Sequence, residues 1–173
     1  KTEIKEILEA VQAGKLSAAD ALLAIKKEPF EDIGYAKIDL HRSIRQGMPE
    51  VIYGAGKTAE QIIGIAERMK LNGQHTVLIT RLSPESAEQI AARHPMAYHA
   101  DAKVGVIWPI PPASGIGKIV VATGGTSDIP VAEEAALTAE AHGNEVVRLY
   151  DVGVAGLHRL LAHLDDIMSA SVI

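Results

Sequence analysis

The sequence predicts an α/β protein in which two short helices precede an N-terminal α/β domain and an incomplete parallel sheet follows. Near the N-terminus, apolar residues recur with helical spacing. From residue 75 onward, strand-like segments alternate with segments that carry helix-start signals. Toward the C-terminus the strand-like segments become continuous apolar runs, which are typical of buried parallel strands. This β-α-β-α-β order implies a parallel sheet with right-handed crossovers.

The first 30 residues predict two helices. The apolar positions Ile4, Ile7, Leu8 and Val11 follow the spacing of one buried helix face. Ser17 is a candidate N-cap for a second helix, which we expect over residues 18–27. The apolar face of that second helix would consist of Leu22, Leu23 and Ile25.

The period then changes to that of strands. Residues 35–40 alternate apolar and polar, as a half-buried strand does, and residues 50–53 indicate a second strand. Between them, residues 41–47 are typical of a short helical turn. Thr58 is predicted to cap the next helix, and Gln61 completes a capping box. The buried face of this helix is expected to comprise Ile62, Ile63, Ile65, Ala66 and Met69.

From residue 75 the elements alternate more regularly. A strand is expected over 75–82, and Ser83 followed by Pro84 is a strong signal for the start of a helix that runs to about residue 94. Residues 97–108 are rich in strand formers. Prolines and glycines then crowd residues 109–117, which is the best domain boundary in the sequence. We therefore expect one domain over 1–112 and a second, partial domain over 118–173.

The second domain is predicted to hold a strand over 119–122, a Gly-rich turn and a helix that ends near residue 142. A strand over 145–150 and a helix over 155–167 follow. Another strand begins at Ser171, so we expect the chain to be truncated after Ile173.

Composition excludes several classes of protein. Hydrophobic residues make up 47% of the 173 residues and the net charge is −5, which excludes global disorder. The chain has no run of basic residues suited to duplex nucleic acid and no apolar stretch of membrane-spanning length. We therefore expect a cytoplasmic protein without a nucleic-acid or membrane partner. The chain contains no cysteine, so a disulfide, a thiolate metal site and a cysteine nucleophile are excluded within it.

The sharpest motif follows the strand over 119–122 and precedes a helix. It consists of Gly124, Gly125, Thr126, Ser127 and Asp128. Ligands bind at the carboxyl ends of strands in open α/β sheets, and free N–H groups at a helix start favour anions. The motif therefore predicts a phosphate or carboxylate site. The alternative is a plain turn with a side-chain cap, since Ser and Asp both favour that position.

A second motif follows the strand over 145–150 and opens onto the same sheet edge. Asp151, Gly153 and Gly156 combine an acidic group with positions that allow close backbone approach. Asp151 could orient His158 or act as its ionic partner. The alternative is that His158 and Arg159 are ordinary solvated helix residues, which for a single His is at least as probable.

Other polar groups offer weaker signals. In the N-terminal region, Lys37, Asp39, Arg42 and Arg45 could contact phosphates or carboxylates, although a solvent-facing charged edge explains their spacing equally well. Lys57 could touch an anion at a helix start. Its Gly-Lys-Thr run is not a P-loop, because that motif needs glycine where Val51 stands. The seven histidines show no confident metal spacing, so no metal site is predicted.

Two long runs resemble the LarB family. They are ATGGTSDIPVAEEAALTAEAHGNEVVRLYDVGVAGLHRLL over 122–161 and FEDIGYAKIDLHRSIRQGMPEVIYGAGKTAEQI over 30–62. The resemblance implies a second domain similar to PurE, the aminoimidazole ribonucleotide carboxylase/mutase, with a flavodoxin-like parallel sheet. It also implies assembly as a homo-oligomer, an octamer by analogy with PurE.

The resemblance further implies an activity. The expected enzyme carboxylates C5 of the pyridinium ring of nicotinic acid adenine dinucleotide, with carbon dioxide or bicarbonate as co-substrate. It also hydrolyses the phosphoanhydride, which releases AMP and gives pyridinium-3,5-biscarboxylic acid mononucleotide. This is the first step in making the nickel-pincer nucleotide cofactor of lactate racemase. No organic cofactor is expected, and Mg²⁺ is a candidate auxiliary ion.

Carboxylation requires an activated ring. A pyridinium ring is electron-poor, but a nucleophile that adds to it creates an enamine-like carbon able to attack carbon dioxide. The family resemblance implies a cysteine nucleophile, which we expect beyond Ile173. Within this chain, Asp128 and His158 are the candidate catalytic residues. The alternatives are a PurE-type carboxylase/mutase and a non-catalytic nucleotide-binding module.

Overall fold

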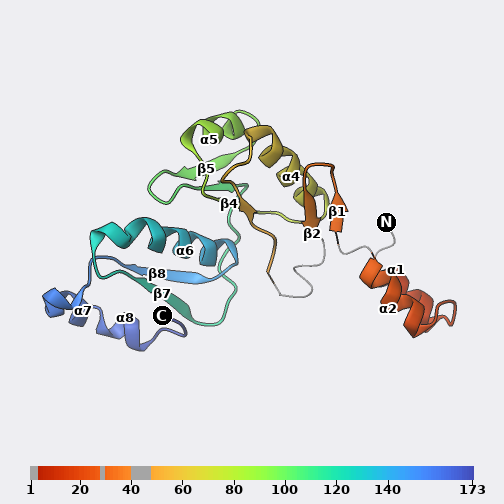
Figure 1. The fold of residues 1–173 in the computed structure, drawn as a ribbon. Coiled ribbons are helices and arrows are strands. Elements are labelled where there is room, and N and C mark those ends of the chain that lie inside the picture. The colour runs from red at the N-terminus through yellow and green to blue at the C-terminus, as the bar shows by residue number, and fades with distance from the viewer. Residues whose placement is uncertain (1–3, 28–29, 40–47) are drawn as a thin grey trace. The chain divides into compact units, whose positions relative to one another are not determined.

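The computed structural model describes residues 4–27, 30–39 and 48–173. Contacts within the chain divide it into two compact units, which cover residues 1–47 and 48–173. The mixed α/β architecture predicted from the sequence is confirmed (Figure 1).

The first unit contains a helix pair and a hairpin. Helices α1 (Ile4–Gln12) and α2 (Ala18–Lys27) contact each other, and Ser17 caps α2 by accepting the N–H of Asp20 at 3.0 Å. Strands β1 (Phe30–Asp32) and β2 (Lys37–Asp39) pair in antiparallel fashion. The sequence predicted β2 but not its partner β1.

The apolar faces predicted for the two helices are only partly buried. Ile7 and Ala21 are buried. In contrast, Leu8, Leu22 and Leu23 remain 57%, 54% and 49% exposed. Two short helices that pack chiefly on each other have one contact face, which is narrower than the apolar stripe that each carries.

The second unit begins with a four-stranded mixed sheet in the order β3-β4-β6-β5. Its strands are β3 (Ile52–Tyr53), β4 (Val77–Thr80), β5 (Met96–His99) and β6 (Val104–Ile107). Strands β3 and β4 are parallel, whereas β6 pairs in antiparallel fashion with both β4 and β5. Residues 97–108 therefore form a hairpin.

Two helices accompany this sheet. Helix α4 (Ala59–Leu71) begins with the predicted capping box, in which Thr58 Oγ1 accepts the Gln61 N–H at 3.2 Å. The five apolar residues predicted for its core face are all buried. Helix α5 (Pro84–Ala91) is capped by Ser83 as predicted, but it ends three residues earlier than expected. Because Pro95 cannot continue a helix, the chain before it closes as a turn.

A second sheet consists of two parallel strands, β7 (Lys118–Ala122) and β8 (Glu145–Leu149). Helix α6 (Ile129–Ala141) connects them and follows a 3₁₀ turn over Thr126–Asp128. Val172 forms an isolated parallel bridge with Ile119, where another strand was predicted to begin. Of the β7 residues only Val120 is fully buried, so the continuous apolar run marks a partly covered strand.

The helix predicted over 155–167 is two short helices. They are α7 (Leu157–Leu161) and α8 (Leu164–Met168), and a 3₁₀ turn over Val154–Gly156 precedes α7. Leu160 and Ile167 pack against a small core of Val120, Leu149 and Val152. The break between the helices lets both of them contribute to this core.

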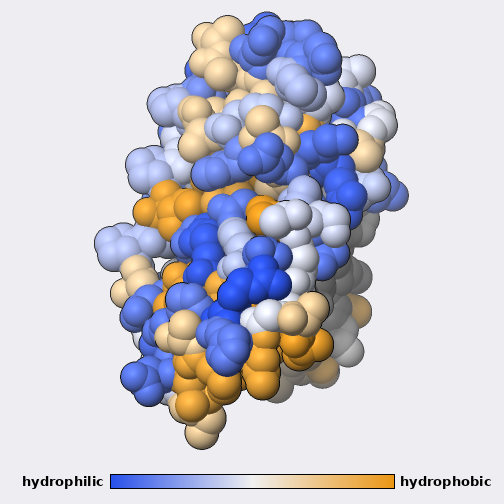
Figure 2. Space-filling model, turned by 90° about the vertical axis from the view of Figure 1, so that its left-hand side faces the viewer, coloured by the Kyte–Doolittle hydropathy of each residue, from blue (hydrophilic) through white to orange (hydrophobic). Residues whose placement is uncertain are grey.

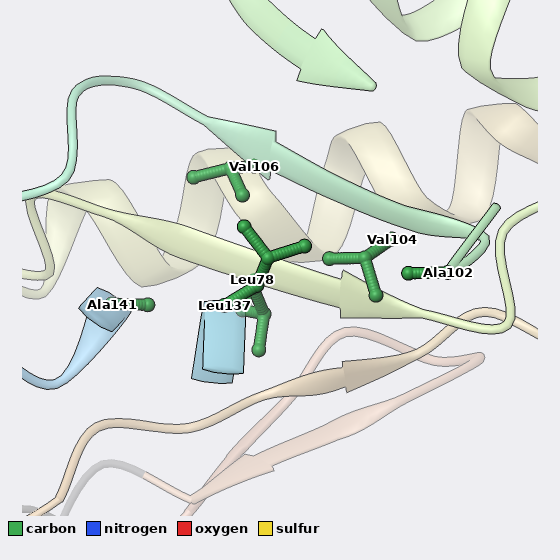
Figure 3. Close-up of a cluster of buried hydrophobic side chains, with 6 residues drawn as sticks. All are labelled: Leu78, Ala102, Val104, Val106, Leu137 and Ala141. Carbon is green, nitrogen blue, oxygen red and sulfur yellow. The ribbon is translucent and has the colours of Figure 1, made fainter. Parts of the chain in front are cut away.

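Helix α6 packs against both sheets of the second unit, since it contacts β7 and β8 and also β4. Leu137 and Ala141 on α6 join a buried cluster with residues of the first sheet (Figure 3). The other members are Leu78, Ala102, Val104 and Val106. The domain boundary between residues 112 and 118 stays a prediction. The contacts of α6 with the first sheet join residues before this boundary to residues after it.

Apolar side chains are exposed on the two last helices. They gather at the lower end of the view in Figure 2, where α7 and α8 lie. Leu157, Leu161, Leu164 and Met168 are each at least 47% exposed. Among the residues that the structure describes, no helix combines the length and apolar character needed to cross a membrane.

Candidate functional site

Two loops meet at the carboxyl edge of the parallel strands, and buried Thr123 joins them. Its N–H donates to the Leu149 carbonyl at 3.0 Å, and its own carbonyl accepts the Val152 N–H at 2.9 Å. The Thr123 hydroxyl accepts the Asp151 N–H at 3.0 Å. These bonds extend the β7–β8 pairing into the loops and fix the start of the second loop relative to the first.

Close backbone approach holds the loops together at Gly124 and Gly153. A Cβ built on Gly153 would lie well inside 3.0 Å of the Gly124 carbonyl oxygen, which is closer than real Cβ atoms come. It would also lie 3.1 Å from the Gly124 carbonyl carbon. Position 153 therefore has no room for a side chain, and the structure brings together the two loops that the sequence placed at one sheet edge.

The polar side chains of the first loop are exposed and do not cap the helix. Gly125 is extended, with φ −140° and ψ 169°, and leads into the 3₁₀ turn. Thr126, Ser127 and Asp128 are exposed. No side-chain hydrogen bond caps the 3₁₀ turn at Gly125 or α6 at Asp128. The structure thus does not show the side-chain cap that was the alternative reading of this motif.

In the second loop, Asp151 pairs with Arg159 and not with His158. The Arg159 guanidinium donates to the Asp151 carboxylate, and both side chains are nearly half exposed. An added Cβ on Gly156 would lie 2.7 Å from Arg159 Nε, so the arginine folds over this glycine to reach its partner. His158 is exposed. Neighbouring helix positions point about 100° apart, which separates the two side chains.

A polar network that the sequence reading missed joins α6 to β8. Arg148 Nε donates to Glu133 Oε2 at 2.9 Å, and its Nη2 donates to Glu140 Oε2 at 2.9 Å. The Tyr150 hydroxyl also donates to Glu133. Glu133, Glu140 and Arg148 are each less than a third exposed. The third acidic group on α6, Glu134, pairs with Arg81 at 3.4 Å.

The network shifts the pKa values of Arg148, Tyr150 and Glu133. Hydrogen bonds to Glu140 and Glu133 raise the pKa of Arg148 despite burial of the guanidinium. Burial, together with the hydrogen bond to Glu133, raises the pKa of Tyr150 to about 12. Burial acts to raise the pKa of Glu133, but the hydrogen bonds from Arg148 and Tyr150 outweigh it and hold this pKa below its ordinary value. Near neutral pH, Arg148 and Glu133 are therefore charged, and the Tyr150 hydroxyl keeps its proton.

One sequence signal could have revealed this network. Glu133 and Glu140 are seven residues apart, which is close to two helical turns, so they share a face with the core residues Ala136 and Leu137. Arg148 is the fourth of the five residues of β8 and lies between apolar Val147 and Leu149. An arginine in that position needs a carboxylate partner on the element that covers the strand.

The remaining predicted residues lie elsewhere. Lys57 donates to the Tyr53 carbonyl at 2.7 Å, so its ammonium already has an internal acceptor. In the first unit, Lys37 lies 4.0 Å from the Asp32 carboxylate, and Asp39 is half-buried two residues along the same strand. Arg42 and Arg45 fall outside the described residues.

Among the parts of the chain that the structure describes, no three His, Asp or Glu side chains gather in a way that could hold a metal ion. These residues offer no ready cage for Mg²⁺.

Comparison with known proteins identifies the relatives of this chain. Residues 30–109 match the family described as the LarB/PurE-like N-terminal domain. The chain is also 35% identical, over 184 aligned residues, to the uncharacterized protein MJ0165 of Methanocaldococcus jannaschii. That alignment covers 98% of this chain and 69% of the relative. Together with the match to an enzyme domain of carboxylase type, this similarity shows that the chain belongs to the LarB family.

Proposed function

We propose that this protein acts as a LarB-type carboxylase and hydrolase on nicotinic acid adenine dinucleotide. The observation that carries the proposal is the pair of loops at the carboxyl edge of β7 and β8. Their backbones meet at Gly124 and Gly153, and the first loop presents exposed hydroxyls and a carboxylate that cap nothing. Such an edge is where α/β sheets bind ligands.

Each loop contributes a different kind of group. Thr126 and Ser127 supply hydroxyl donors beside the first N–H groups of the helical segment, an arrangement that suits a phosphate or carboxylate oxygen. Asp128 and His158 are the groups proposed to move protons. Carboxylation at C5 replaces a ring hydrogen, so the proton released from that carbon must pass to a base. We assign this base to Asp128 or His158.

The ring-activating step needs a nucleophile in addition. Its addition converts the pyridinium into an enamine-like ring, and its departure restores aromaticity after the carboxylate is in place. The family resemblance assigns this role to a cysteine, and this chain has none. The described residues therefore supply substrate binding and proton transfer in this proposal.

The direct test incubates the full-length protein with nicotinic acid adenine dinucleotide, bicarbonate and Mg²⁺. The proposal expects AMP and a doubly carboxylated mononucleotide, both detectable by mass spectrometry. The Asp128→Ala variant should lose turnover while keeping its fold, because Asp128 is exposed. Asp101→Ala, at another exposed position, is the matched control. Unchanged turnover in Asp128→Ala would remove that residue from the mechanism, and absence of both products in the parent protein would refute the activity.

A non-catalytic nucleotide-binding module is the second candidate. It would use the same exposed loop groups for binding alone. This candidate predicts that the dinucleotide binds, as measured by calorimetry, while no AMP forms even in the full-length protein. A PurE-type activity would appear instead as turnover of aminoimidazole ribonucleotide.

A further inference from the structure

An open hollow of about 470 Å³ lies along β5 and the end of β6, away from the two loops. Ala97 and Val106 line it and face each other across the two strands in register. His99 lines it further along β5, and Trp108 and Ile110 line it just beyond the end of β6. Its volume falls in the usual range for small-molecule sites.

The hollow exists because the sheet face is unevenly covered. Val106 and Ile110 belong to the cluster that α6 covers with Leu137 and Ala141. On β5, the small side chain of Ala97 leaves space above the strand, and Ala97 is itself exposed. Its partner across the strands, Val106, is buried, so Ala97 is the open part of this pair.

The lining selects an uncharged aromatic group. None of the residues that line the hollow is Lys, Arg, Asp or Glu, so a phosphate or carboxylate would find no ionic partner there. Two side chains with ring systems, His99 and Trp108, supply the polar atoms. An imidazole can donate or accept a hydrogen bond and an indole N–H donates, which suits a nitrogen heterocycle.

Trp108 is held from outside the hollow. Lys70 Nζ lies 4.3 Å from the centroid of the indole, and the His94 ring meets it edge-on at 5.7 Å between centroids. The backbone at Trp108 has φ +66°, which is unfavourable for a large side chain. Such strain persists only where surrounding contacts enforce it, and it gathers at ligand sites. The Trp108 indole is therefore held in place at one side of the hollow.

The hollow is connected to the loop site through α6. Val106 and Ile110, which line the hollow, share an apolar cluster with Leu137 of α6. Leu137 is nine residues along the chain from Asp128, which corresponds to about 13.5 Å of helix rise. A molecule with a planar base at one end and phosphates at the other could use both places together.

We propose that this hollow binds the purine ring of the adenosine half of the dinucleotide substrate. The inference rests on the proposed function for the identity of the substrate. The purine packs on the exposed Ala97 beside Trp108, and the phosphates extend toward the loop that contains Asp128.

The single tryptophan of the chain reports on this site directly. Adenosine is expected to quench Trp108 fluorescence in a saturable way in the full-length protein, whereas inorganic phosphate and ribose are not. Ala97→Phe fills the hollow and should weaken adenosine binding by about tenfold or more, equivalent to about 1.4 kcal/mol. Ala91→Phe, at an exposed position on α5, is the control and should bind adenosine as the parent does. Circular dichroism checks that both variants fold.

Failure of this inference can be told apart from failure of the proposed function. If the parent protein turns over the dinucleotide and Ala97→Phe leaves its KM unchanged, the purine site is wrong and the activity stands. If the parent protein shows no turnover but adenosine quenches Trp108 and Ala97→Phe abolishes the effect, the purine site stands without the activity. Absence of saturable quenching by adenosine in the parent protein overturns the inference in either case.

Discussion

The contact between Gly124 and Gly153 makes a sharp prediction about stability. In Gly153→Ala, the new Cβ would fall within contact of the Gly124 carbonyl oxygen, its carbonyl carbon at 3.1 Å and its Cα at 3.3 Å. All three are backbone atoms, so no side chain can rotate away and the loops must move apart. Overpacking of this kind costs about 2 kcal/mol. For a chain of this size the Tm should fall by about 4 to 8 °C.

Gly124→Ala is the matched control, because a Cβ at that position meets nothing within 4 Å. Both variants add one methyl group to the same loop pair, so their difference isolates the clash from the general effect of replacing glycine. Thermal unfolding followed by circular dichroism measures the two Tm values, and a binding titration with the dinucleotide reports on the loops. Equal Tm values for the two variants would refute the close approach of the loops.

Four further predictions concern the polar network and a helix cap. Arg148→Met should lower stability by about 2 kcal/mol in urea unfolding, because it leaves Glu133 without its main ionic partner; the partial exposure of these groups keeps the cost below that of a fully buried pair. The pKa of Glu133 is lowered in the folded state, so its ionised form stabilises the fold above about pH 4.5, and this stabilisation is lost as the pH falls further. In Glu133→Gln, the free energy of unfolding should therefore decrease less steeply as the pH is lowered. The pKa of Tyr150 is raised to about 12, so the phenolate absorbance that is lost in Tyr150→Phe should develop only well above pH 10 in the folded protein. If that difference between parent and variant were complete by pH 10, it would contradict the bond to Glu133. Thr58→Ala should cost about 1 kcal/mol by the same unfolding measurement, while a Thr58→Ser control retains most of the cap.

Features with local causes could be predicted from the sequence. Thr58 with Gln61 and Ser83 with Pro84 satisfy backbone groups within one turn, so their residue types alone indicate where α4 and α5 begin. The buried face of α4 also follows from spacing. The meeting of the two loops could be predicted as well, because successive parallel strands present their carboxyl ends at one edge.

Features that depend on distant partners could not be predicted in the same way. Glu133 on α6 resembles a solvated helix residue until Arg148, fifteen positions later, is placed opposite it. Both His158 and Arg159 follow Asp151 within eight residues. The position at which α7 begins decides that Arg159 is the partner of Asp151. The exposure of Leu22 depends on how little surface the neighbouring helix covers, which no spacing pattern contains.

The position of α6 between the two sheets has a consequence for how the second unit opens. Leu137 of α6 packs on the first sheet, and the Arg148–Glu140 pair binds the same helix to the second sheet. The helix therefore cannot detach from one sheet without also exposing part of the other. Slow amide hydrogen exchange in β4 and in β8 should then proceed through one shared opening event with a common free energy. The helix would make two small sheets behave as a single cooperative unit.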